Sequence, residues 1–200
     1  LSHSSAASDV YKRQKHNIPV TSTVMGIGCM DKDDPSYIGN IGGLGDKSAN
    51  NLSKNTDLAL AIGTKLGDFT TGSWANFENK DFKLVSINTA RFDVTKHRAT
   101  PVISDAKIGL LELSKVLGNW MAPDVWFNRA KKERIDWQSY VDQQSGPTNQ
   151  ELPSYAHAVG AVYRNSDPSD IVVTAAGGLV GVVVQIWKPK QLNTFETEWG

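Results

Sequence analysis

The residue pattern best suited to binding a ligand is a glycine turn near the end of the chain. It consists of Ala176, Gly177, Gly178 and Leu179. An apolar run over 170–175 predicts a buried strand before the turn, and a second apolar run predicts a helix after it. Glycines let a backbone approach a ligand, and a helix N-terminus offers unpaired N–H groups with a partial positive charge. The turn could therefore hold a phosphate or diphosphate, although a plain close-packed turn is the commoner reading of this pattern alone.

A second glycine-rich run covers 39–45 and is followed by Asp46. It matches neither the dinucleotide-binding fingerprint nor a P-loop, since Asp46 separates the last glycine from Lys47 and would repel a phosphate. ATP hydrolysis is therefore disfavoured, while a nucleotide crevice and a structural loop both stay open. Asp46 is predicted to cap a helix over 47–54 with its carboxylate.

A third candidate stretch, 63–74, follows an apolar strand predicted over 57–62. Ligands bind at the carboxyl ends of strands in open α/β sheets. Thr64, Asp68 and Thr70 could therefore contact a ligand, and they could equally cap turns.

Composition excludes several other kinds of chemistry. The single cysteine, Cys29, rules out an internal disulfide and a CxxC site, and the four histidines show no zinc-binding spacing. Lysine plus arginine equals aspartate plus glutamate, 21 against 21, so no basic excess favours nucleic acid or an anionic membrane surface. No apolar run reaches the length of about 20 residues that a membrane-spanning helix needs, and a cytoplasmic location is expected by default.

The elements that would position these residues alternate along the chain as strands and helices. Short continuous apolar strands between helices predict an α/β fold with a doubly wound parallel sheet buried on both faces. We expect residues 1–14 to be a non-native or disordered lead and 15–119 to form a central α/β domain. Residues 120–150 are predicted to be a helical linker with a solvated charge run, and 151–200 the beginning of a second α/β domain. The chain as a whole is expected to be an internal piece of a longer protein.

The order of these pieces resembles the family of thiamine-diphosphate-dependent enzymes. Four motifs resemble its central domain, namely the glycine loop at 39–51, AIGTKLGDFT at 61–70, VSIN at 85–88 and SDAKIGLLEL at 104–113. The strand at 170–175 is similar to the first strand of the family's diphosphate-binding domain.

The last part of the chain resembles one branch of this family, whose members open the ring of a cyclic 1,2-dione in myo-inositol degradation. VTAAGGL at 173–179, QIW at 185–187 and LNTFETEWG at 192–200 are the motifs concerned. The chain departs from that branch at Val180, Val182 and Val183, where proline and an acidic residue are usual. Any polar role of this helix start is therefore in doubt.

The resemblance implies a hydrolase of C–C bonds that uses thiamine diphosphate and Mg²⁺, acts on a small cyclic dione and assembles as a homo-oligomer. It places Ala176, Gly177, Gly178 and Leu179 near the diphosphate. Glu198 and Trp199 would lie near the cofactor or substrate. The family's catalytic glutamate and its metal-binding motif fall outside this sequence, so no catalytic or metal-ligating residue is assigned here.

Two alternatives stay open. The parent protein could be another thiamine-diphosphate lyase or carboligase, although acetolactate synthases carry a DVGQHQ-like turn where this chain has AAGGL. The other alternative is a non-catalytic nucleotide-binding module that uses only the crevice at 39–45. Whether a flavin occupies the central domain is also left open.

Overall fold

The computed structural model describes residues 16–198. Two sequence predictions lie outside these residues, namely the lead over 1–14 and the role of Trp199.

Strands and helices alternate through most of the described residues. In chain order they are β1 (Val20–Thr23), η1 (Val24–Gly26), β2 (Tyr37–Ile41), α2 (Lys47–Ser53), β3 (Leu58–Ile62), α3 (Asp68–Thr71), β4 (Lys83–Asn88), α4 (Arg91–Val94), η2 (Lys96–Arg98), β5 (Thr100–Ile103), α5 (Ala106–Leu117), α6 (Asp124–Ser145), α7 (Tyr155–Asn165), β6 (Val172–Ala175), α8 (Val180–Ile186) and β7 (Phe195–Glu198). We call β1 to α5 the first unit and α7 to β7 the second unit.

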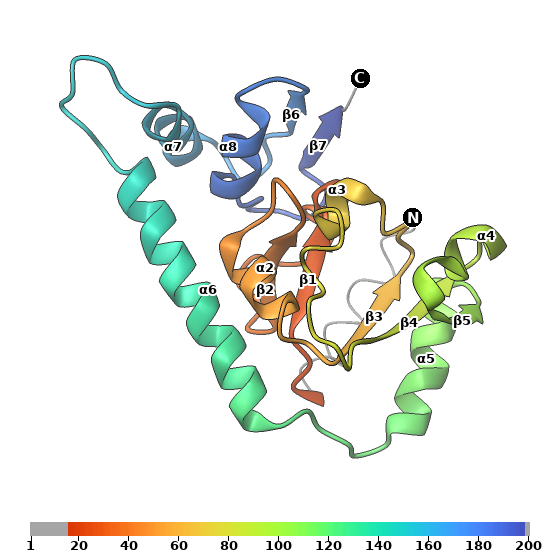
Figure 1. Ribbon diagram of the computed structural model, residues 1–200. Helices are drawn as coiled ribbons and strands as arrows, with labels where there is room; N and C mark the ends of the chain where they lie inside the picture. The colour runs from red at the N-terminus through yellow and green to blue at the C-terminus, as the bar shows by residue number, and fades with distance from the viewer. Residues whose placement is uncertain (1–15, 199–200) are drawn as a thin grey trace.

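Every strand pair is parallel (Figure 1). The strands form three pieces of sheet, β1–β2, β3–β4–β5 and β6–β7. The predicted α/β class with parallel strands is thus confirmed. Short apolar strands separated by helices favour parallel pairing, since each helix carries the chain back to start the next strand in the same direction. The sequence prediction missed β2, because Gly39 and Asn40 within it are typical of turns.

The sequence predicts strands buried on both faces of the sheet, and the structure confirms this for some strands only. Every residue of β2 is buried, whereas every residue of β5 is exposed, including Val102 and Ile103. Among residues 16–198, α4 and α5 pack against β4, and α4 also contacts β5. The β3–β4–β5 sheet is therefore covered much less completely than β2.

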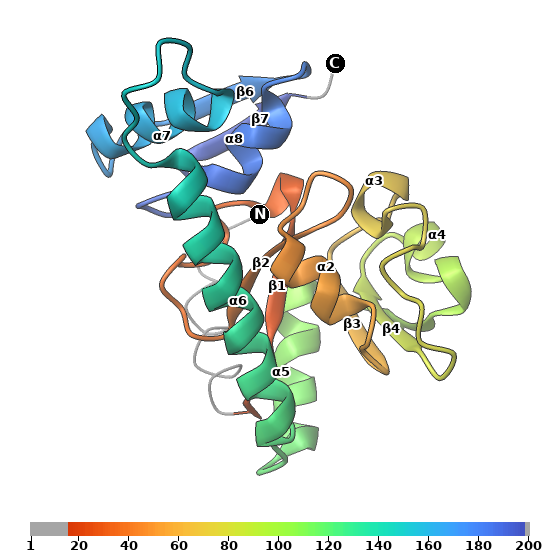
Figure 2. The ribbon, with the colours of Figure 1, turned by 60° about the vertical axis from the view of Figure 1, so that its left-hand side comes forward.

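The long helix α6 joins the two units (Figures 1 and 2). Its first half packs on α2 and β2, where Ala130 lies against Ile38 and Leu52 in one small core. Its second half packs on α7 and α8, where Val141 enters a larger core. That core also contains residues of α7, α8 and β7 and the residues that directly follow η1 and α8, namely Ile27, Val159, Val180, Val183, Val184, Ile186, Trp187 and Phe195.

The charge run on α6 is solvated only in part. Lys132 pairs with Asp136 on the exposed face, as expected for a solvated run. Arg134 instead donates to the backbone oxygens of Asp34, at 2.5 Å, and of Lys32. The guanidinium ties α6 to the loop before β2, so the prediction of a purely solvated run is wrong at this position.

Gly160 on α7 allows this helix to approach the end of α6. A Cβ atom at Gly160 would lie 2.1 Å from the backbone oxygen of Ser145 and 2.8 Å from its Cβ atom. We expect Gly160→Ala to lower the free energy of unfolding by about 2 kcal/mol, because two helix backbones must separate. Urea denaturation followed by circular dichroism measures this change.

Gly43→Ala is the matched control, since its added Cβ atom would meet Phe69 only at 3.8 Å. It should change stability by less than about 0.5 kcal/mol. Equal stability of the two variants would show that α6 and α7 do not pack as closely as described.

Candidate functional site

The glycine turn predicted to bind phosphate lies between β6 and α8. Residues 176–179 are exposed, and Gly177 has a φ of 151°, in the region that favours glycine. Cβ atoms added at Gly177 or Gly178 would meet no atom within 4 Å. Open space therefore borders the backbone of the turn, and a ligand could approach it directly.

Glu198 lies at the same sheet edge as this turn. It is the register partner of Ala175, the last residue of β6, and its side chain is exposed. Because β6 and β7 are parallel, their carboxyl ends meet at one edge. The structure thus brings together residues 176–179 and Glu198, which are about 20 positions apart in sequence.

The valines that depart from the family pattern contribute to packing. Val180 and Val183 are buried in the larger core, and Val182 packs against it. The start of α8 therefore offers backbone N–H groups rather than side-chain polar groups.

The glycine loop at 39–45 differs from the turn because its glycines are packed by the chain itself. A Cβ atom at Gly39 would lie 2.3 Å from a carboxylate oxygen of Asp46, and one at Gly45 would lie 2.3 Å from the backbone oxygen of Asn40. One at Gly42 would lie 2.5 Å from the backbone oxygen of Phe69. These contacts favour a structural role for the loop over a nucleotide crevice.

Asp46 does not cap α2 with its side chain, so that prediction is wrong. The residue stands at the N-cap position, but its carboxylate is 1 % exposed and turns toward other parts of the chain. It accepts hydrogen bonds from the Asn40 backbone N–H, the Trp137 indole N–H and the Lys188 ammonium, at 3.0, 2.9 and 3.0 Å. We call this set of contacts the Asp46 clamp.

A second buried polar cluster lies beside the clamp. The Asn40 side-chain oxygen accepts from the hydroxyls of Ser22 and Tyr37, at 2.8 and 2.7 Å. Its side-chain nitrogen donates to the backbone oxygen of Val184 in α8, at 3.2 Å. Burial raises the pKa of the Tyr37 phenol well above its usual value.

Sequence inspection identified neither Lys188 nor Trp137 as a functional partner of Asp46. They lie 142 and 91 positions away from it, and no local motif marks such pairs. The only sequence signal was an aspartate at a predicted helix start, and the capping interpretation had already used it.

The third candidate stretch makes local contacts. The Thr64 hydroxyl accepts from the Leu66 backbone N–H, at 3.3 Å, and the Asp68 carboxylate accepts from Ser73, at 3.1 Å. Thr70 is half-buried beside them, at the α3 helix. These contacts match the turn-forming interpretation of 63–74.

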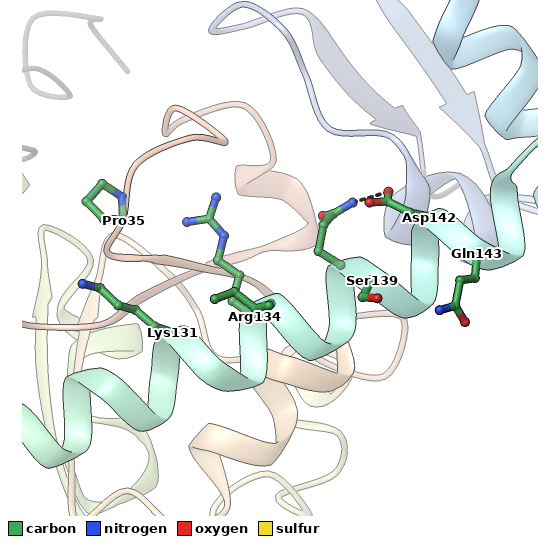
Figure 3. A pocket seen from close by; sticks show the side chains of 8 residues that line it. Pro35, Lys131, Arg134, Ser139, Asp142 and Gln143 are labelled. Carbon is green, nitrogen blue, oxygen red and sulfur yellow. Dashed lines mark hydrogen bonds between the residues drawn. The ribbon is translucent and has the colours of Figure 1, made fainter.

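Two open hollows lie away from the predicted site residues. One of about 750 Å³ lies along α6 beside Pro35, and Lys131, Arg134 and Gln143 line it (Figure 3). Gln138, which also lines it, donates a hydrogen bond to Asp142 at 2.8 Å. The other, of about 690 Å³, lies between α7 and the start of β6. None of the residues 176–179 or Glu198 lines either hollow.

Neither a metal cluster nor a membrane-crossing helix is found in the described part of the chain. Over 16–198, no three side chains of His, Cys, Asp or Glu are placed to hold a metal ion together. Within the same residues, none of the helices combines the length and apolar character that crossing a lipid bilayer requires.

Comparison with known families and proteins gives consistent matches. Residues 11–113 match the family described as thiamine pyrophosphate enzyme, central domain. The chain is also similar to proteins named 3D-(3,5/4)-trihydroxycyclohexane-1,2-dione hydrolase. The one from Geobacillus thermodenitrificans is 28 % identical over 221 residues, which cover 98 % of this chain and 34 % of the relative.

Two further relatives carry the same name. The protein from Bacillus anthracis is 30 % identical over 208 residues, covering 92 % of this chain and 32 % of the relative. The protein from Clostridium tetani is 28 % identical over 222 residues, covering 98 % and 34 %. The chain thus spans about a third of the length of the curated relatives it matches.

The raised pKa of Tyr37 predicts a loss of stability at alkaline pH. The unfolded chain releases the phenolic proton near pH 10, whereas the folded chain keeps it, so stability present below pH 10 is lost as pH rises. The slope contributed by Tyr37 should approach about 1.4 kcal/mol per pH unit. Urea unfolding at several alkaline pH values measures it.

Tyr37→Phe should make this slope shallower, even though it lowers stability at neutral pH by removing the bond to Asn40. The two proteins differ in no other titratable group, so the difference in slope reports Tyr37. Identical slopes would mean that the phenol is accessible to water.

Proposed function

The chain belongs to the thiamine pyrophosphate enzyme family, and on that premise we propose that its parent protein is a thiamine-diphosphate-dependent hydrolase. Its substrate would be a cyclic 1,2-dione of the trihydroxycyclohexane type, whose ring opens by hydrolysis of a C–C bond. The names of the relatives support this substrate, as does the AAGGL turn at 175–179. The hydrolysis adds hydroxyl to the carbonyl carbon and a proton to the other carbon of the broken bond.

The observation that carries the proposal is the open turn at the carboxyl edge of β6. A diphosphate needs backbone N–H groups that it can approach closely, and glycines without neighbours at their Cβ positions allow that approach. At the start of α8 the N–H groups of Val182 and Val183 both donate to the Leu179 backbone oxygen, so the contact with the anion is proposed for the backbone of the turn itself. The residues present therefore fit the diphosphate end of the cofactor.

In this proposal the chain binds and orients the cofactor. Thiamine diphosphate, when bound, supplies a nucleophilic carbon and an electron sink. The turn would hold the diphosphate, while the buried valines of α8 fix the helix that follows the turn. Glu198, at the same sheet edge as the turn, would stand near the cofactor or substrate.

Mg²⁺ is proposed as a further cofactor of the complete protein on the family resemblance alone, and no residue of this chain is assigned to it. The same resemblance supports a homo-oligomer as the working form of the complete protein. A cytoplasmic location stays a prediction from the sequence.

The two alternatives have less support. An acetolactate-synthase-like activity would fit the same family, but the turn lacks the DVGQHQ-like residues expected for it. A nucleotide module would need the loop at 39–45 to be open, and its glycines lie against the chain itself. Comparing turnover of the cyclic dione with turnover of pyruvate by the complete protein separates the hydrolase from an acetolactate-synthase-like enzyme. Titration with FAD, NAD and ADP tests the nucleotide module.

Gly178→Ala tests the turn directly. Its Cβ atom would meet open space, so folding should be unchanged, whereas a diphosphate lying on the backbone would meet the new methyl group. In the complete protein we expect thiamine diphosphate to bind about tenfold more weakly. Isothermal titration calorimetry with and without Mg²⁺ gives the affinity.

Gly67→Ala is the matched control, because its Cβ position is also open and lies outside the turn. It should bind the cofactor as the unchanged protein does. Unchanged affinity in the Gly178→Ala protein would remove residues 176–179 from the diphosphate site.

A further inference from the structure

We propose that Asp46 is a positioning residue for the cofactor, holding α8 and the turn at 176–179 in place through Lys188. The inference rests on the proposed function, since it assumes that this turn binds the diphosphate. Asp46 lies in the first unit and would not touch the cofactor itself.

The ion pair at the centre of the clamp is buried and fully satisfied. The Lys188 Nζ atom lies 3.2 and 3.0 Å from the two carboxylate oxygens of Asp46. The two side chains are 13 % and 1 % exposed. Trp137 donates to one of these oxygens and the Asn40 backbone N–H to the other, so each oxygen has two donors. A buried carboxylate requires such partners, and each donor is thereby fixed in position.

Lys188 connects this clamp to α8. It follows the helix after only Trp187, whose ring is buried and packs edge-on against Tyr163. Two more bonds run from the glycine loop to the same helix. Asn40 donates to the Val184 backbone oxygen at 3.2 Å, and Gln185 donates to the Gly45 backbone oxygen at 3.4 Å. The loop at 39–46 thus holds α8 at several points near its C-terminal end.

The turn at the other end of α8 has no comparable support. Gly177 and Gly178 have no atom near their Cβ positions, and residues 176–179 are all exposed. In the described residues β6 pairs only with β7. The direction of the N–H groups at the turn therefore depends on where α8 is held, which the buried valines of the helix and the clamp determine together.

The same geometry gives the packed glycine loop at 39–45 a role in holding α8. Leu44 would be 3.4 Å from a Cβ atom at Gly181, so the loop meets the first turn of α8 as well. In some proteins a buried ion pair serves to fix one arrangement of two packed surfaces. The clamp would therefore select one orientation of the cofactor turn rather than merely add stability.

The test uses Lys188→Met in the complete protein that contains this chain. The methionine keeps the stem of the side chain but removes the charge, so α8 loses the ion pair among the contacts that hold its C-terminal end. We expect thiamine diphosphate to bind about tenfold more weakly, as is common when a supporting residue of a ligand site is lost. Once the cofactor is saturating, kcat should stay within about twofold. Lys188→Arg, which keeps the charge, should recover most of the affinity.

Lys132→Met is the matched control, because Lys132 makes an exposed ion pair with Asp136 on α6. It should leave cofactor affinity unchanged. Trp137→Phe provides a milder variant that removes a single donor to Asp46, and it replaces Lys188→Met if that protein fails to fold.

A second measurement follows the clamp in the 200-residue chain without any cofactor. Hydrogen exchange of the α8 amides, including Val183 and Trp187, should be at least about tenfold faster in Lys188→Met than in Lys132→Met. Faster exchange with unchanged cofactor affinity would overturn the positioning role and leave a structural one. If the unchanged protein binds no thiamine diphosphate, the proposed function fails, whatever the exchange data show.

Discussion

The buried carboxylate of Asp46 is the constraint on which the arrangement of the two units depends. It receives donors from the strand before it, from α6 and from the segment after α8. Taking a charge out of water is costly unless its oxygens are satisfied, so these three segments can pack only with their donors in place. Breaking one partner of such a pair typically costs about 3–5 kcal/mol. That is a large share of the roughly 5–15 kcal/mol by which domains are stable.

The two glycine-rich runs show how similar sequences take opposite roles. At 39–45 the missing side chains let a loop close on its own backbone and on Asp46, and no room is left for a ligand. At 176–179 the missing side chains border open space at a sheet edge, beside Glu198. Composition alone cannot separate these cases, since glycine serves close packing and close approach equally well. The glycine run at 39–45 thus packs against α8, the helix that follows the turn at 176–179.

Local patterns in the sequence were enough to predict the parallel α/β fold and most of its elements. The helix predicted over 47–54 is found at Lys47–Ser53, and the strand predicted over 57–62 is found at Leu58–Ile62. The contacts of Asp46 with Trp137 and Lys188 were not predictable in this way, because these partners lie 91 and 142 positions distant. Arg134 itself reaches loop oxygens 100 and 102 positions away. The glycine pattern and the family resemblance both indicated the turn at 176–179, and the resemblance also named Glu198; the strand register then showed the two at one sheet edge.

A double-mutant cycle between Asp46 and Lys188 is the most direct test of the clamp. Asp46→Asn, Lys188→Met and the double variant of the chain would be unfolded in urea, and their free energies of unfolding compared. We predict a coupling energy of about 2 kcal/mol, because either single change leaves the other group buried without its partner. Additive effects within about 0.5 kcal/mol would mean that the two side chains do not interact, and the clamp would then not be what holds the two units together.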